Sequence, residues 1–386
     1  MVRENKTNIT VGKGELYAAH LAFFLPGFAI ATWAPMIPMV KERLNIEADV
    51  LGILLLCVGI SAFFIMPIAG MLGRKFGCRK VMAVSAAVMV IDLVVLSLLQ
   101  NIWGYAVFLA VMGIFMGAMD VNMNVNAVVV EKLVKRRIMS GMHAFWSIGG
   151  FVGAGLFSLL AKMGLGITAI ASVHCAIVLL LTLISTPHFL TYKDNGGGSI
   201  IAVPRGIVIV LGLVAGISFL AEGAVMDWSG VFLTEVKSWD MSMAGFGYAV
   251  FSVAMLLMRL IGDRVVKLLG ERAVLLFGSC LLSVGFLLIV FIDGTYLMAL
   301  PFILIGLGGA NIVPVLYSML NRQHNMPIGS AVTAITCMGY TGVILGPAVL
   351  GFIAHGIGLT GVFYLLTVLM AMQAVITIYV SKRMDA

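Results

Sequence analysis

The sequence predicts an all-α integral membrane protein whose twelve transmembrane helices form two pseudo-symmetric bundles of six. Three observations predict this class. The 386 residues are 61% hydrophobic and only 11% charged, whereas a soluble domain is about 45–50% apolar and about 25% charged. Apolar runs of roughly 18 residues or more recur along the chain, and each is long enough to cross a bilayer as a helix. Short motifs of the first half also return in the second half.

Twelve apolar runs predict the individual helices. Each run lacks the alternation of polar and apolar residues that marks a membrane strand, so it favours a helix over a strand of a barrel. Only helices and closed barrels satisfy their backbone hydrogen bonds in lipid. In chain order, the helices are expected at 14–40, 50–73, 79–99, 102–131, 138–163, 166–188, 205–235, 242–268, 272–292, 295–322, 327–357 and 360–381.

A polar segment separates the two predicted bundles. Residues 189–204 read FLTYKDNGGGSIIAVP, and a composition rich in glycine and serine is typical of a flexible linker. We therefore expect an N-terminal six-helix bundle over 1–188, a cytoplasmic linker over 189–204 and a C-terminal six-helix bundle over 205–386.

Basic residues predict the orientation of the chain. With a cytoplasmic N-terminus, nineteen of the 24 Lys and Arg residues fall on the cytoplasmic side, all except Lys41, Arg43, Lys162, Lys237 and the intramembrane Arg259. Cytoplasmic loops are enriched in Lys and Arg, so both termini are expected in the cytoplasm. The net charge of +7 then follows from topology and contact with membrane lipid, and no nucleic-acid partner is expected.

Several function classes find no support in the sequence. The five cysteines are scattered and odd in number, which predicts neither a disulfide framework nor a metal site. The sequence contains no phosphate-binding loop motif that could serve an ATP-driven pump, and no nucleophile–base pair is recognisable. We therefore expect neither an enzyme nor a bound cofactor.

Matching segments indicate an internal repeat. GAMD, which ends at Asp120, aligns with GGAN, which ends at Asn311, at an offset of 191 residues. The glycine-rich segments around Gly149 and Gly339 align at an offset of 190 residues. Two parallel six-helix halves are typical of a large transporter architecture, in which the solute site lies between the halves near the middle of the membrane.

The segment GAMDVNMNVNAVV (117–129) places four polar residues inside an apolar helix. Asp120 and Asn124 lie four residues apart and share one helix face, while Asn122 and Asn126 share nearly the opposite face. Asparagines often hold neighbouring helices together by hydrogen bonds. An ionised carboxylate at mid-helix costs about 2.5–3.5 kcal/mol or more. Asp120 should therefore face a cavity, where burial favours its neutral, protonated form.

A second polar group lies in the segment FLAEGAVMDWSG (219–230). Glu222 and Asp227 could border the same cavity, although Asp227 could equally be solvated near the outer interface. Trp228 matches Trp33 in the repeat, and either tryptophan could stack on a solute or anchor the outer interface. His143 could titrate or gate, or it could hydrogen-bond a neighbouring helix.

Arg259 and Asp263 lie four residues apart in the eighth predicted helix. This spacing predicts an ion pair within the helix at its cytoplasmic edge, and a gate is a further possible role. Asp120, Asn124, Glu222 and Asn311 are expected to share one aqueous cavity, because each would otherwise lose hydrogen bonds in lipid.

The chain resembles the major facilitator superfamily over essentially its full length. The basic turn GMLGRKFGCRK (70–80) resembles the loop of that superfamily between helices two and three, but Arg74 stands where the usual pattern has Asp. The segments 120–131, 142–150, 221–233 and 247–264 resemble the YbjJ-like group of small permeases, which is similar to the fucose permeases. The resemblance implies a major facilitator fold, and it implies that Asp120 takes the place of an acidic residue used in proton coupling.

Two functions are expected from these observations. The first is a secondary active transporter that moves a small polar, sugar-like solute into the cell together with protons by alternating access. The alternative is a proton-antiport exporter of amphiphilic or drug-like compounds. Exporters of the resembling superfamily often carry Gly-Pro in the fifth helix, where GGFVGAG (149–155) has no proline. We expect a monomer in the inner membrane of a bacterial cell.

Overall fold

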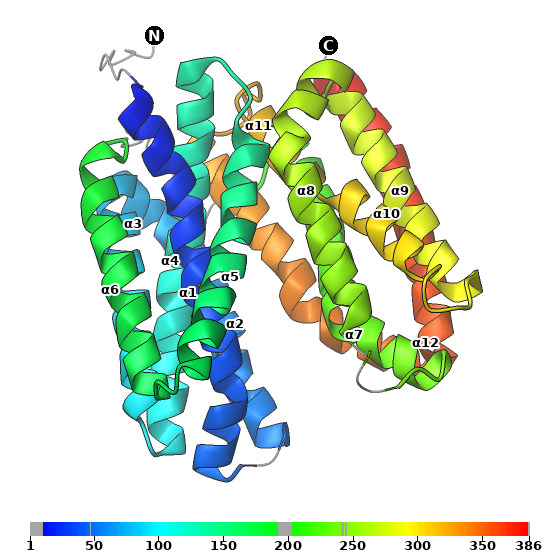
Figure 1. Cartoon of the computed structure of the whole chain (residues 1–386). Helices are drawn as coiled ribbons and strands as arrows, with labels where there is room; N and C mark the ends of the chain where they lie inside the picture. The colour runs from blue at the N-terminus through cyan, green and yellow to red at the C-terminus, as the bar shows by residue number, and fades with distance from the viewer. Residues whose placement is uncertain (1–10, 47, 192–202, 241–242, 244, 385–386) are drawn as a thin grey trace.

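The computed structural model describes residues 11–46, 48–191, 203–240, 243 and 245–384, and the chain is helical in nearly all of them, with no strand in these ranges. Figure 1 shows the helices as two groups that lie side by side. The first group contains α1 (Lys13–Leu44), α2 (Ala48–Phe76), α3 (Cys78–Leu98), α4 (Ile102–Val134), α5 (Met139–Lys162), α6 (Ile167–Ser185) and the short η1 (Thr186–His188).

The second group contains α7 (Ile207–Val231), the π-helical turn η2 (Phe232–Val236), α8 (Phe246–Leu269), α9 (Glu271–Phe291), α10 (Ala299–Gly309), α11 (Ile312–Met319) and α12 (Ile328–Met384). Helix α12 contains a break at Gly358, whose φ of 72° is left-handed and is readily adopted only by glycine. This break separates the predicted helices 327–357 and 360–381.

The observed helices agree with the predicted ones, apart from a break in the tenth. The predicted helix 295–322 is divided between α10 and α11, and the break falls at Ala310 and Asn311. Eleven helical segments of the described chain are long and apolar enough to cross a membrane, which is consistent with twelve predicted spans. The all-α membrane fold is confirmed.

The packing within the first group is repeated in the second. Helix α1 packs against α5, α2 against α4, and α3 against both α4 and α6. In the second group α7 packs against α12, α8 against α10, and α9 against both α10 and α12. The predicted boundaries at 188 and 205 stay a proposal, since residues 192–202 of the expected linker lie outside the described residues.

Glycines allow close packing of α1 against α5. An added Cβ at Gly149 would collide with the backbone carbonyl of Phe24, and one at Gly153 would lie 2.7 Å from the carbonyl oxygen of Phe28. Small residues let helix backbones approach closely, and the resulting van der Waals packing is one source of attraction between helices in lipid. The segment GGFVGAG therefore fixes the position of α5 against α1.

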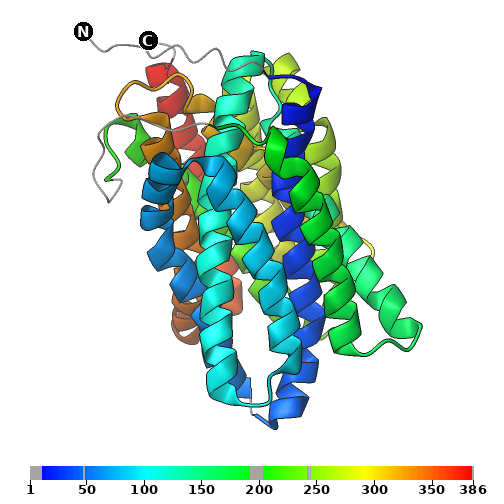
Figure 2. The same cartoon turned by 90° about the vertical axis from the view of Figure 1, so that its left-hand side faces the viewer.

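Large apolar side chains cover the outer surface of both groups. Phe64 is 69% exposed, Leu183 72% and Phe352 83%. Exposed apolar surface of this extent is a liability in water, but lipid chains solvate it. Figure 2 shows that the beginning of α1 and the end of α12 lie at the same end of the molecule, which we call the terminal end.

Candidate functional site

The polar residues of α4 lie inside the protein rather than toward lipid. Asn122 donates from Nδ2 to the carbonyl oxygens of Ala69 in α2, at 3.1 Å, and of Ala118, at 2.9 Å. This contact confirms that Asn122 joins two helices. Asn124 donates from Nδ2 to the carbonyl oxygen of Asp120 at 2.9 Å, and its Oδ1 has no partner among the described residues.

Asp120 is a buried carboxylate that faces the second group of helices. Its residue is 9% exposed, and no described residue donates a hydrogen bond to its carboxylate. Its carboxyl group lies close to Tyr317 of α11 and to Cys337 and Tyr340 of α12. An unpaired carboxylate in this setting is stable only when it is protonated or reached by water.

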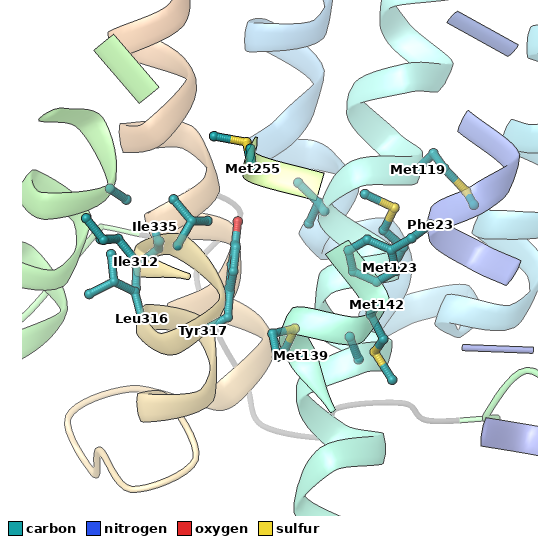
Figure 3. Close-up of a cluster of buried hydrophobic side chains, with 14 of the residues drawn as sticks. Phe23, Met119, Met123, Met139, Met142, Met255, Ile312, Leu316, Tyr317 and Ile335 are labelled. Atoms are coloured by element: carbon teal, nitrogen blue, oxygen red, sulfur yellow. The ribbon is translucent and has the colours of Figure 1, made fainter. Parts of the chain in front are cut away.

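Tyr317 lies at the meeting point of the two groups. Its hydroxyl shares a hydrogen bond of 2.8 Å with Oγ1 of Thr336, and its ring stacks on that of His143 from α5 at 6.0 Å between centroids. Figure 3 shows Tyr317 between α12 and a set of methionines that includes Met139 and Met142. Methionine adapts its shape readily, which suits a contact that must open and close.

Arg259 of α8 contacts three other parts of the chain. Its Nη2 lies 3.8 Å from Oε1 of Glu222 in α7, its Nη1 donates to Oγ of Ser147 in α5 at 3.4 Å, and its Nε donates to the carbonyl oxygen of Ala310 at 3.2 Å. The side chains of Arg259 and Glu222 are 9% and 22% exposed. One arginine therefore connects α7, the break after α10 and, across the interface, α5.

The break between α10 and α11 supplies one of these partners. Pro314 has no backbone N–H, so the carbonyl oxygen of Ala310 loses the hydrogen bond that a regular helix would give it. A cation at the C-terminal end of a helix is also favourable because of the helix dipole. Asn311, at the break, is buried against Gly262 of α8, and its Oδ1 has no partner among the described residues.

At the terminal end, two carboxylates bind the first backbone N–H groups of α5. Glu131 of α4 accepts from the N–H groups of Ile138 and Met139 at 2.9 and 3.0 Å. Asp263 of α8 accepts from those of Ser140 and Gly141 at 3.0 Å each. These N–H groups have no partner within the helix. Asp263 thus binds the second group of helices to the first.

The predicted ion pair between Arg259 and Asp263 is wrong. Arg259 pairs with Glu222, and Asp263 pairs with the N-terminus of α5. Each side chain finds a partner that otherwise has none, namely the carbonyl oxygen of Ala310 for Arg259 and the N–H groups of α5 for Asp263. Where water is excluded, satisfying these backbone groups lowers the free energy more than an ion pair within one helix would.

Further contacts join the two groups at the terminal end. Glu271 binds Arg137 of the first group at 2.5 Å and also binds Arg322 of its own group. Arg74 donates to Oγ of Ser330 at 3.3 Å, near the beginning of α12. None of these pairs was predicted, although the clustering of basic residues around 132–137 indicates a surface that attracts acidic partners.

The other predicted residues lie outside this network. Trp33 is buried in α1, and Trp228 packs close to Gly351 of α12 with its Nε1 unpartnered among the described residues. Asp227 is exposed on α7. A groove of about 320 Å³ lies between α7 and α12, but Asp120, Glu222 and Asn311 do not line it. The expectation of one cavity shared by these residues stays a prediction.

Comparison with known proteins identifies the family. The model of the Major Facilitator Superfamily matches residues 19–217 and 211–385. An uncharacterized MFS-type transporter of Yersinia pestis is 41% identical over 347 residues, which are 89% of this chain and 90% of that protein.

Two solved structures share the fold. The human organic anion transporter MFSD10 has a TM-score of 0.79 at 15% identity, covering 95% of this chain and 99% of that one. The E. coli fucose:proton symporter has a TM-score of 0.75 at 14% identity, covering 95% and 98%. The chain belongs to the major facilitator superfamily of transporters.

Proposed function

We propose that this transporter takes up a small polar, sugar-like solute together with protons by alternating access. The observation that carries the proposal is Asp120, a buried carboxylate without a hydrogen-bond donor among the described residues, which faces Tyr317 across the interface. A carboxylate in such a place can gain and lose a proton as water access changes. The similarity in fold to a fucose:proton symporter supports the same reading.

The residues that the sequence analysis singled out divide into three proposed roles. Proton coupling is carried by Asp120 and by Glu222, whose charge is balanced by Arg259, with Asp227 as an outer acid. The solute is bound by Asn124, His143 and Asn311, whose unpartnered polar atoms suit hydroxyl groups, and by the aromatic faces of Trp33 and Trp228. Arg259 and Asp263 act as gates, because both bind α5 across the interface.

We further propose that the terminal end is cytoplasmic, in the inner membrane of a bacterium, and that the protein works as a monomer. The contacts of Asp263 and Glu271 across the interface then close the cytoplasmic side. A reporter enzyme that is active only outside the cytoplasm should give no signal when it is fused at position 195. Strong activity there would contradict this orientation.

The direction of coupling distinguishes uptake from export. A thermal-shift screen of sugars, organic acids and drug-like amphiphiles identifies a solute, because a ligand of the folded state raises its stability. In liposomes that carry the protein in one orientation, an acidic medium on the non-terminal side should drive accumulation of that solute toward the terminal side. If the same gradient drives the solute the other way, the protein is an antiporter and the exporter hypothesis replaces this one.

A further inference from the structure

The N-terminus of α12 lacks the two carboxylates that bind the N-terminus of α5. Asp263 and Glu131 together accept from four N–H groups at the beginning of α5. In the internal repeat Asn321 takes the place of Glu131, and Arg74 takes the place of Asp263. Arg74 of α2 donates to Oγ of Ser330 in the first turn of α12 at 3.3 Å. A cation therefore lies at a helix N-terminus, where the helix dipole favours negative charge.

The packing of two glycines supports this alignment of the repeat. An added Cβ at Gly262 would collide with Oδ1 of Asn311, and one at Gly73 would collide with Oδ1 of Asn122. The residue after each glycine, an aspartate in α8 and an arginine in α2, contacts the first turn of a helix in the other group. The two contacts are therefore equivalent in position but opposite in charge.

The first backbone N–H groups of α12 need an acceptor. Ala331 donates to the carbonyl oxygen of Pro327 at 2.9 Å. No residue in the described part of the chain accepts from the N–H groups of Ile328, Gly329 or Ser330, which begin the helix. Gly329 and Ser330 are buried. Since buried N–H groups are nearly always paired, this end of α12 suits a ligand that accepts hydrogen bonds.

A small cavity lies beside this N-terminus, where α2 packs against α12. Arg74 and Asn122 line it from the first group of helices, and Gly329 lines it from the second. Asn122 is 1% exposed. Its Nδ2 donates to two carbonyl oxygens, whereas its Oδ1 has no partner among the described residues. The cavity thus combines a cation and backbone donors with one acceptor that needs a donor.

We propose that this site binds a phosphate group that keeps one hydrogen, either hydrogen phosphate or a phosphomonoester. Its charged oxygens accept from Arg74 and from the N–H groups of Gly329 and Ser330, as anions do at helix N-termini. A guanidinium has five N–H donors, so Arg74 can bind Ser330 and the phosphate together. The O–H of the phosphate donates to Oδ1 of Asn122. Because Arg74 is only half-buried, the group can enter from the terminal end.

The bound phosphate takes the place of the missing carboxylates. It connects α2 of the first group to α12 of the second, as Asp263 connects α8 to α5. Its binding therefore stabilises closure of the terminal end. Free phosphate on that side would then regulate how readily the transporter opens there.

Calorimetric titration of inorganic phosphate into the protein, in a detergent without phosphate, tests the site. Arg74→Gln should weaken binding about tenfold, the effect of losing one hydrogen bond to a charged group. The control Lys75→Gln removes an exposed charge next to it and should leave the affinity nearly unchanged. No phosphate binding, or equal binding by Arg74→Gln, would overturn the proposal.

Sulfate tests the role of Asn122. It resembles phosphate in shape but has no hydrogen to donate at neutral pH, so Oδ1 of Asn122 would stay unpaired. We expect sulfate to bind about fivefold more weakly than phosphate, the effect of leaving one buried acceptor without a donor. Sulfate binding as tight as phosphate binding would contradict this role.

Arg74→Asp tests the link to closure, because it supplies the carboxylate that this half of the repeat lacks. Spin labels at Lys135→Cys and Lys267→Cys, exposed positions in the two groups, report closure as the ratio of short to long distances. The native cysteines other than the buried Cys78 are replaced by alanine. Saturating phosphate should raise the ratio about fivefold in the wild type. Arg74→Asp should close without phosphate, and a phosphate effect as large as in the wild type would overturn the proposal.

Nanodiscs with and without phosphatidic acid, a phosphomonoester lipid, distinguish two sources of the group. If the lipid headgroup occupies the site, phosphatidic acid should compete with free phosphate, and undiminished phosphate binding identifies a soluble occupant. Either result supports the site. These measurements use no solute and no proton gradient, so their failure leaves the proposed function untouched. Failure of proton coupling in turn leaves the phosphate site untouched.

Discussion

Asp120→Asn is expected to abolish solute accumulation driven by a proton gradient, reducing it to the level reached without a gradient. The amide has nearly the shape of the protonated acid but cannot release a proton. Solute exchange between equal concentrations on both sides should therefore survive. The measurement is uptake of labelled solute into liposomes under both conditions.

A matched control for Asp120→Asn lies in α3. Asp92 is also a buried carboxylate whose oxygens have no partner among the described residues, but α3 packs against α2, α4, α6 and α1 within its own group. Asp92→Asn should leave accumulation intact.

The stability of Asp120→Asn should equal or exceed that of the wild type, because a charged aspartate at this depth costs about 2.5–3.5 kcal/mol. Normal accumulation by Asp120→Asn would remove this residue from the coupling role.

Arg259→Met is expected to destabilise the protein by about 3 kcal/mol, the lower end of the range for removing one partner of a buried pair. Glu222 would lose its counter-charge, and the carbonyl oxygen of Ala310 would lose its donor. The lower end applies because the Glu222 side chain is 22% exposed and water can partly solvate it. Thermal unfolding in detergent measures the loss, and transport should fall with it.

The double variant Arg259→Met, Glu222→Gln separates stability from function. Removing both charges avoids an unpaired buried ion, so much of the stability should return. Transport should not return, because Arg259 no longer connects α7 with Ser147 of α5. A double variant that transports normally would show that the pair serves only stability.

The sequence was sufficient to predict the helices but not their polar contacts. Length and hydropathy determine which segments can span a bilayer, and this property is local. The break between α10 and α11 was not predicted, although Asn311 and Pro314 in an apolar run are a signal for it. Proline removes one backbone N–H, and the consequence becomes visible only when Arg259 is seen to bind the freed carbonyl oxygen.

Contacts between distant helices could not be predicted from spacing. The four-residue separation of Arg259 and Asp263 predicted a pair within α8, but each residue binds backbone groups of another helix. Which unsatisfied backbone groups lie nearby depends on how the two groups of helices meet. Asp120 differs, because the cost of a carboxylate in an apolar helix marks it as unusual before any neighbour is known.

The most direct test of the central claim is to count protons and solute molecules in the same liposomes. With a pH indicator outside and labelled solute, wild-type uptake without an imposed gradient should remove a proton from the medium with each solute molecule that enters. Asp120→Asn should let solute enter down its concentration gradient with no change in external pH. Proton movement that persists in Asp120→Asn at the wild-type ratio, or wild-type uptake with no proton movement at all, would contradict the account.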